Sequence, residues 1–412
     1  MIKNRADSTV WTNTLIYYIA LVVNIVLGWG LAKINTHYLT VELYGQYSFF
    51  LIFLFMSRSF FGFGLSESVS RQLALTGDEH RRRQLTGMAL TWSLVFSLVF
   101  GITLLILSAF VDRIFEVRIG NLLHIYAWVS GIILIHTFLL LVLRGYGRIG
   151  LMAESTVYPR IFYLIWLIPV ILWQSFTIQQ TLTAMFAGYV IAVIITIVRL
   201  RPEFSGIRML SRGILLEIKS YGIHLYVGAI WQELLFHTDK LVISLYLDNR
   251  SIAYYALAYM LTFPLSHFST SLATSLFRKF SQTILIDRRV LLANLAFVLS
   301  SVTIFILLRY QIVVGLFSVD YLPSVALIIP LAMAFGFSGF SKPFTLFLMA
   351  RGKGKVIRNI SIIVPIIQII LTVSVIPVYG ITGSAWCTFT VYLLDMLLNV
   401  IAYQRMRRAG SA

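Results

Sequence analysis

Ionisable side chains in the middle of an apolar run are the part of this sequence with the most obvious chemistry. The run extends from about residue 221 to 247, long enough to cross a bilayer, and carries Glu233, His237, Asp239 and Lys240. Such side chains cost several kcal/mol at bilayer depth, so their presence indicates a function. On a helix, Glu233, His237 and Lys240 recur at i, i+4 and i+7 and share one face. A stripe of this kind lines a neighbouring helix or a water-filled path, where it would bind a charged ligand or relay a proton.

Four further charges interrupt other apolar runs, at Arg58, Arg160, Lys342 and Asp395. Each could instead snorkel towards the headgroups or form an internal ion pair, and this alternative weighs most at Arg160. The surplus of cations over anions favours an anionic substrate bound through its phosphates, because arginine suits bidentate contacts and lysine acts as a point charge. A drug exporter for organic cations would instead want an acidic, aromatic-lined pocket. We therefore predict substrate-binding roles for Arg58, Lys240, Lys342 and Arg160, and roles in coupling or ion pairing for Glu233, His237, Asp239 and Asp395.

Motifs for catalysis or metal binding are not evident. The seven histidines lack a metal-ligand spacing, so a packed or interfacial role is the alternative for each, His237 included. Cys387 is the only cysteine, which excludes a Cys-based zinc site and an intramolecular disulfide. The glycines of Arg144–Arg148 and Arg351–Lys355 fit no nucleotide-binding motif and indicate tight turns whose basic residues meet lipid headgroups. We predict no catalytic residue, no metal, no cofactor and no enzymatic activity.

The elements that would position these charges follow from composition. The chain has 412 residues, of which 59% are hydrophobic and only 12% charged, about half the charge of an ordinary soluble domain. The apolar runs are about 20 residues long, whereas transmembrane strands need about 9 to 11. We therefore predict an all-α integral membrane protein with about twelve transmembrane helices. Their expected ranges are 13–34, 43–66, 86–110, 121–143, 156–174, 180–199, 220–247, 252–277, 290–315, 323–350, 357–378 and 381–404.

The distribution of lysine and arginine predicts the orientation. Lys3 and Arg5 precede a first apolar run that is interpreted as a retained helix rather than a cleaved signal peptide. Two long basic connections, 71–83 and 199–219, and most other basic residues fall on the same predicted side as that terminus, whereas the opposite segments hold only Arg113, Arg118, Arg250 and Arg309. The positive-inside rule then places both termini in the cytoplasm. The net charge of +17 is explained by topology and by anionic lipid, so no nucleic acid is expected as a partner.

An internal repeat divides the chain into halves. The segment Arg144–Arg148 recurs as Arg351–Lys355, and Tyr47 and Pro169 correspond to Tyr255 and Pro377, all at an offset of 207 or 208 residues. We predict two six-helix lobes, residues 1–205 and 206–412. Because each half would start and end on one side of the membrane, the repeats are parallel and related by an axis along the membrane normal. A central cavity between rocking lobes is the layout of a transporter.

Short motifs add a family resemblance. Leu39-Thr40 with Gly45-Gln46-Tyr47, the segment Ser251–Tyr255 and His237–Leu241 resemble the Wzx-type O-antigen flippases of the multidrug/oligosaccharidyl-lipid/polysaccharide (MOP) exporter superfamily. The resemblance implies a MATE-like V-shaped bundle in a bacterial inner membrane that moves an undecaprenyl-pyrophosphate-linked oligosaccharide for lipopolysaccharide or another surface polysaccharide. The implied partners are that glycan, membrane lipids, and the polysaccharide polymerase with its chain-length machinery.

Two alternatives stay open. An ion-coupled small-molecule or multidrug antiporter of the same superfamily would share the fold, although the acidic first-helix positions typical of such exporters are not evident and Lys33 is the only charge near the outer end of that helix. A membrane enzyme such as a polysaccharide polymerase or ligase would need a large extracytoplasmic loop, and the predicted outer connections are short. The sequence does not identify the sugar or the coupling ion.

Overall fold

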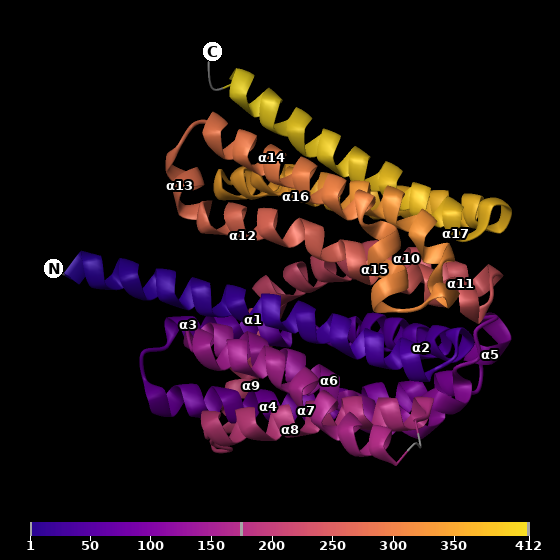
Figure 1. The fold of residues 1–412 in the computed structure, drawn as a ribbon. Coiled ribbons are helices and arrows are strands. Elements are labelled where there is room, and N and C mark those ends of the chain that lie inside the picture. Colours follow the sequence, from indigo (N-terminus) through magenta and orange to yellow (C-terminus); the bar gives the residue numbers. More distant parts are fainter. Residues whose placement is uncertain (1, 174–175, 410–412) are drawn as a thin grey trace. The chain divides into compact units, whose positions relative to one another are not determined.

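The computed structural model describes residues 2–173 and 176–409, and this part of the chain contains helices and no strand (Figure 1). Side chains are described from residue 15 onwards, except at 224, 225, 278, 281 and 409. The predictions for Lys3, Arg5 and His224 therefore fall outside the described side chains.

The first half of the chain forms α1 (Ile2–Tyr38), α2 (Val41–Ser59), α3 (Leu65–Leu75), α4 (Glu79–Ser108), α5 (Val111–Ile114), α6 (Gly120–Tyr146), α7 (Ile149–Leu172) and α8 (Ile178–Leu200). The second half forms α9 (Ile207–Glu217), the π-helix η1 (Ile218–Gly222), α10 (Ile223–Tyr246), α11 (Asn249–Thr262), the 3₁₀ helix η2 (Phe263–Ser266), α12 (His267–Ser275), α13 (Phe277–Gln282), α14 (Arg288–Leu307), α15 (Arg309–Leu316), the 3₁₀ helix η3 (Val319–Tyr321), α16 (Pro323–Ala350) and α17 (Gly354–Ala409).

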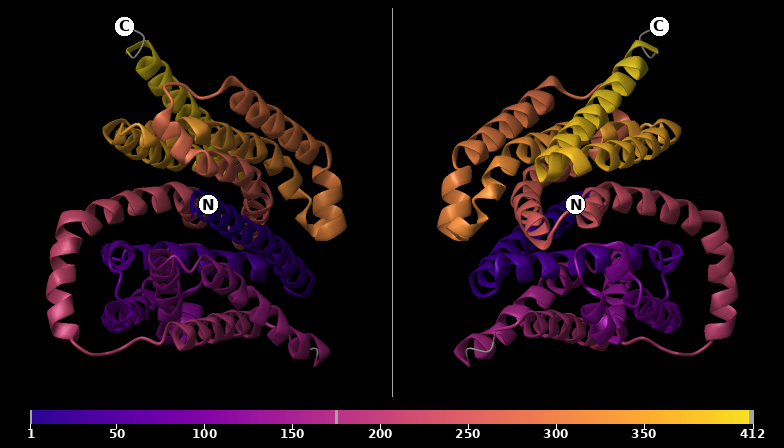
Figure 2. Two further views of the ribbon diagram at one scale, coloured as in Figure 1. Left: turned by 90° about the vertical axis from the view of Figure 1, so that its left-hand side faces the viewer. Right: turned by 90° about the vertical axis from the view of Figure 1, so that its right-hand side faces the viewer.

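Eight helices in the described part of the chain are long and apolar enough to cross a membrane: α1, α4, α6, α7, α8, α14, α16 and α17. They contain nine of the twelve predicted spans, because α17 includes two of them. Gly380, at φ 58° and ψ −148°, separates these two, and Figure 2 shows the arms of α17 running in different directions. Glycine adopts such a conformation without steric cost, so the break falls where the sequence predicted it. The other three predicted spans are the more polar or interrupted ones, 43–66, 220–247 and 252–277.

The two long basic connections are not simple loops, and this prediction was wrong. Segment 71–83 includes the end of α3 and the start of α4, and 199–219 includes α9. Both short helices bury one apolar side, Leu65, Val69 and Leu73 in α3 and Leu210 and Ile214 in α9. The three- to four-residue spacing of those side chains is the helical signal, which the surrounding arginines obscured. Figure 2 shows the chain changing direction between α9 and α10.

Three predicted spans are interrupted. The span 43–66 covers α2, the turn at residues 60–64 and the start of α3. The span 252–277 divides into α11, η2 and α12, with Pro264 at the start of the 3₁₀ turn. Proline has no N–H to donate to the preceding turn, so the regular helix cannot continue through it. The span 290–315 divides at Leu308, where α14 ends and α15 begins.

The described contacts group the chain into two compact units. Unit 1 comprises residues 1–39, 53–114 and 118–230, and unit 2 comprises 40–52, 115–117 and 231–412. The helices α2 and α10 each contribute residues to both units. The predicted lobe boundary at residue 205 was based on the internal repeat, whereas these units are based on contacts. The boundary therefore stays a prediction.

Each unit has its own core. In unit 1, apolar faces of α3, α4, α6, α8 and α9 meet around fully buried residues such as Leu73, Met88 and Leu139. Glycine permits the closest approach there, because a side chain on Gly145 would overlap the backbone of Ser70. In unit 2, α16 is the central helix and packs against α11, α12, α14 and α17. An aromatic cluster around Phe335 and Tyr392 fills the space between α11, α16 and α17.

Candidate functional site

A buried ion pair on α10 lies in unit 2. Lys240 and Asp239 are 5% and 1% exposed, and Lys240 Nζ lies 3.0 Å from Asp239 Oδ1. The ammonium also donates to the carbonyl of Phe236 at 2.5 Å and lies 3.3 Å from the centre of the Tyr259 ring. A carboxylate, a carbonyl and an aromatic face together replace the water that a lysine loses on burial.

The Asp239 carboxylate connects three helices. Its Oδ2 accepts a hydrogen bond from the Tyr255 hydroxyl of α11 at 2.6 Å, and that hydroxyl lies 3.0 Å from Thr388 Oγ1 of α17. Tyr255 is fully buried and Thr388 is 1% exposed. Any change in the charge of Asp239 therefore affects contacts of α10, α11 and α17 at once.

Glu233 and His237 form a separate pair on α10, about two turns and one turn before Lys240. His237 Nε2 lies 3.2 Å from Glu233 Oε2, and the two side chains keep 19% and 31% of their exposure. Lys240 follows His237 by three residues in the predicted stripe. Its described contacts are all with residues of the buried Asp239 cluster. Glu233 and His237 of the predicted stripe are thus in direct contact, whereas Lys240 is buried in the protein.

Lys342 and Asp395 face each other from α16 and α17. Asp395 accepts hydrogen bonds from Ser341 Oγ at 3.3 Å and from Asn399 Nδ2 at 3.1 Å, and Thr345 Oγ1 donates to Asn399 Oδ1 at 3.0 Å. Lys342 is half-buried, and the Asp395 carboxylate acts on it electrostatically although no ion pair between them is described. The ammonium of Lys342 is therefore balanced by a carboxylate without being bonded to it.

The two buried arginines belong to unit 1. Arg58 of α2 donates to Thr137 Oγ1 of α6 and, through Nε, to the carbonyl of Phe55 at 3.3 Å. Arg160 of α7 donates to the carbonyl of Asn24 on α1. Space for that guanidinium comes from Gly28, where an added Cβ would lie 3.2 Å from Arg160 Nη1. Both side chains are half-buried, and both are held in place by neutral oxygens of the same unit.

Within the units, the structure brings several predicted site residues together: Asp239 with Lys240, Glu233 with His237, and Lys342 near Asp395. It also adds polar neighbours that the sequence analysis did not single out, among them Thr137, Tyr259, Thr388 and Asn399. On α17 a signal was available, because Thr388, Asp395 and Asn399 recur at i, i+7 and i+11 and therefore share one helix face. The carbonyl of Asn24 had no such signal, since backbone acceptors leave no trace in composition.

A family model described as polysaccharide biosynthesis protein matches residues 10–284. Among solved structures, the lipid II flippase MurJ in an inward closed conformation is 18% identical and has a TM-score of 0.76, over 95% of this chain and 87% of that chain. An inward-facing MATE multidrug transporter of the MOP superfamily is 15% identical, with a TM-score of 0.73 over 96% and 95%. A MOP superfamily transporter from Pyrococcus furiosus, described as having a binding pocket of reverse polarity, is 13% identical, with a TM-score of 0.62 over 97% and 96%. A search of curated proteins found no match.

These likenesses, at identities below 20%, concern the fold. They confirm the predicted class, an all-α integral membrane protein with a MATE-like bundle of helices.

Proposed function

The chain belongs to the polysaccharide biosynthesis protein family and has the fold of MOP superfamily transporters, and from that premise we propose that it is a flippase for a lipid-linked oligosaccharide. Its substrate would be an undecaprenyl-pyrophosphate-linked repeat unit of O-antigen or another surface polysaccharide. Transfer would run from the cytoplasmic to the outer leaflet of a bacterial inner membrane.

One observation carries this proposal: four cationic side chains, Arg58, Arg160, Lys240 and Lys342, are half or fully buried in the helices of a membrane protein. Each costs several kcal/mol at bilayer depth, so each is expected to have a function, and binding an anion is one that suits a buried cation. The pyrophosphate of a lipid-linked sugar is such an anion. Arginine offers it a planar fork of donors that matches two phosphate oxygens, which an ammonium does not.

The individual roles follow from the contacts. Arg58 and Arg160 would bind the pyrophosphate or acidic sugars, because a guanidinium keeps its charge and presents a planar fork of donors that matches phosphate oxygens. Lys342 would add a point charge. Glu233 with His237, and Asp395 with Lys342, would serve in coupling, since protonation of either partner changes the local charge. Lys240 has its described contacts within the buried Asp239 cluster and would act from there, through the conformation of α10.

The antiporter alternative has its own support in the MATE structures that match nearly the whole chain. It would use Asp239 and Asp395 as the cation-linked carboxylates of unit 2. Deletion would then change drug accumulation and leave the surface glycan intact.

The decisive experiment compares surface polysaccharide in a deletion strain complemented with wild type, Arg58→Ala, Arg160→Ala or Lys342→Ala at equal protein abundance. Lys353→Ala is the matched control, because Lys353 is an exposed cation in the turn after α16. We expect loss of surface polysaccharide and accumulation of lipid-linked intermediates for the three buried cations only. Wild-type polysaccharide in all three variants would reject the proposed site, and a normal glycan with altered drug accumulation on deletion would favour the antiporter.

The proposed orientation places both termini, and the turns after α6 and α16, in the cytoplasm. Cys387 is buried, so a Cys387→Ser background leaves room for a single reporter cysteine. Lys353→Cys should react with a membrane-impermeant maleimide only after the inner membrane is permeabilised, and Arg113→Cys should react without permeabilisation. The opposite pattern would invert the topology. Contacts with a polysaccharide polymerase and its chain-length machinery are part of the same proposal and would be sought by cross-linking in cells.

A further inference from the structure

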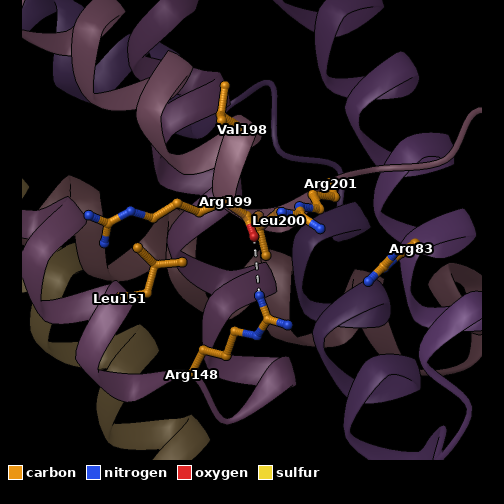
Figure 3. Close-up of a pocket in the computed structure, with 7 residues that line it drawn as sticks. All are labelled: Arg83, Arg148, Leu151, Val198, Arg199, Leu200 and Arg201. Carbon is orange, nitrogen blue, oxygen red and sulfur yellow. Dashed lines mark hydrogen bonds between the residues drawn. The ribbon is translucent and has the colours of Figure 1, made fainter.

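A second cationic site lies in unit 1, at the ends of four membrane-spanning helices. A cavity of about 520 Å³ is lined by Arg83 of α4, Arg148 and Leu151 at the start of α7, and Val198, Arg199, Leu200 and Arg201 at the end of α8 (Figure 3). The side chains of Arg83, Arg148 and Arg201 point towards a common space in Figure 3, whereas Arg199 points away from it. Arg199 instead pairs with Glu154. Three guanidiniums from three helices therefore converge on one cavity.

Two carboxylates balance these three cations only in part. Arg148 Nη2 lies 3.2 Å from Glu79 Oε1, while Arg83 is 3.8 Å from Glu79 and 3.9 Å from Glu203, beyond hydrogen-bond distance. Arg83 Nε is buried and has no hydrogen-bond partner among the described residues. Glu79 and Glu203 thus attract the Arg83 guanidinium electrostatically, but its Nε–H donates no described hydrogen bond.

Arg201 has no described partner for its side chain at all. Its backbone, at φ 49° and ψ 60°, closes α8 in the left-handed region that favours glycine. Arg201 is an exposed residue at the rim of the cavity, so its guanidinium is accessible to an anion.

Backbone donors add to the arginines. The helix α7 is 24 residues long and begins at the cavity without a side-chain cap, so the N–H groups of its first turn have no intrahelical acceptor. Helix N-termini carry a partial positive charge and bind phosphate through these N–H groups. Gly147 and Gly150, on either side of Arg148, leave open space in which a ligand could approach the backbone.

From this convergence we propose that the cavity binds the phosphate group of an anionic ligand. The site lies at the ends of the spans α4, α6, α7 and α8, the depth at which lipid headgroups lie whichever way the protein is inserted. The phosphate would come from an anionic phospholipid or from a soluble phosphate. Arg83, Arg148 and Arg201 would donate to its oxygens, together with the first turn of α7.

The turn after α16 provides a matched control. It carries Arg351 and Lys353 on a similar glycine-containing turn, and neither residue lines the arginine cavity. General attraction between basic residues and an anionic surface would make the two turns equivalent, whereas a built site makes only the first one matter. The test therefore compares Arg148→Gln/Arg201→Gln with Arg351→Gln/Lys353→Gln, which remove the same charge.

Binding would be measured on full-length protein in detergent by calorimetric titration with dioctanoyl phosphatidylglycerol, dioctanoyl phosphatidylcholine or inorganic phosphate. We expect Arg148→Gln/Arg201→Gln to weaken the binding of phosphatidylglycerol about tenfold or more, because charge-assisted bonds are the strong ones, and the control pair to weaken it less than about twofold. Phosphatidylcholine, which has no net charge, should bind weakly to all variants.

The two phosphate sources give different outcomes. Binding of phosphatidylglycerol without inorganic phosphate supports a lipid site, and binding of inorganic phosphate, lost in the same variant, supports a soluble source. Equal losses in both double variants, or no binding of either probe to wild type, would overturn the proposal. Melting temperature controls for folding, and Arg148→Lys, which keeps the charge but loses the fork, should lie between wild type and the double variant.

Discussion

The buried cations of the two units have different kinds of partner. Within unit 1, Arg58 and Arg160 donate to neutral oxygens, a threonine hydroxyl and backbone carbonyls. Within unit 2, Lys240 is in contact with the carboxylate of Asp239, and Lys342 lies near that of Asp395. Among these four cations, the two of unit 1 are arginines and the two of unit 2 are lysines.

The difference has a chemical reason. Arginine stays protonated in almost any surroundings, so it keeps its charge where neutral oxygens surround it. Lysine readily loses its proton on burial, and a nearby carboxylate opposes that loss. Unit 1 therefore offers a permanent positive charge suited to an anion, whereas the charge in unit 2 depends on whether a carboxylate is ionised. We propose that substrate binding falls mainly to unit 1 and coupling to unit 2, and the following predictions test this proposal.

The largest effect is expected at the buried pair of unit 2. Asp239→Asn leaves Lys240 without its counter-ion and should destabilise the protein by roughly 3–5 kcal/mol, the usual cost of breaking a buried pair. Melting temperature and the yield of monodisperse protein would report it. Asp239→Asn combined with Lys240→Met removes both charges and should recover much of the loss. If Asp239→Asn alone were as stable as wild type, the Asp239 carboxylate would not be required to stabilise buried Lys240.

At Arg58 the effect is expected on transport rather than stability. Arg58→Ala should reduce surface polysaccharide about tenfold or more at unchanged abundance, since it removes charge-assisted contacts to the substrate. Arg58→Lys should retain part of the activity because it keeps the charge without the fork. Equal activity of Arg58→Lys and wild type would remove the argument for bidentate binding in unit 1.

Asp395→Asn should change stability little, by about 1 kcal/mol or less, because the amide can still bond with Ser341 and Asn399. Transport is expected to lose part of its pH dependence, since the variant has no proton to exchange at this position. The rate of translocation into vesicles would be measured across a pH series. An unchanged pH profile would exclude Asp395 from coupling and weaken the assignment of that role to unit 2.

An exposed pair in unit 2 provides the smallest effect and a reference for the buried one. Glu42 at the start of α2 pairs with Arg250, and its own backbone N–H and then Arg250 lower the pKa of the carboxyl. A lowered pKa contributes stability above the ordinary pKa of glutamate, which is lost as the pH falls through the folded-state value. Glu42→Gln should lower the melting temperature at pH 7 by less than about 2 °C, because exposed pairs are screened. The difference from wild type should disappear under acidic conditions, and a loss as large as that of Asp239→Asn would remove the contrast between exposed and buried pairs.

The internal repeat shows how far sequence matching extends. At an offset of 207, Gly145 corresponds to Gly352, yet the glycines with positive φ are Gly147 and Gly352. Each closes its helix with the same pair of backbone hydrogen bonds, from Gly147 and Arg148 in one turn and from Gly352 and Lys353 in the other. Gly145 has a different task, close packing against Ser70. The two similar sequences thus form similar turns. The glycine with positive φ, however, lies two positions earlier in the second turn than the offset of 207 predicts.

The sequence by itself determined the class of protein, nearly all of the helical segments, and the positions at which charges interrupt the apolar segments. Each of these depends on local quantities, the hydropathy of about 20 consecutive residues or the spacing along one helix. The sequences of α3 and α9 contain a local signal of the same kind, apolar residues at helical spacing. It is weaker there because arginines lie close by in the sequence.

Only the tertiary structure decided which groups meet. Asn24 and Arg160 are 136 residues apart in unit 1, and Asp239, Tyr255 and Thr388 come from three helices of unit 2. Periodicity indicates which residues share a face, but not which helix that face will meet, because the choice among neighbours depends on packing of the whole unit. The arginine cavity is the clearest case, since its three converging side chains are ordinary basic residues until the ends of α4, α7 and α8 bring them together.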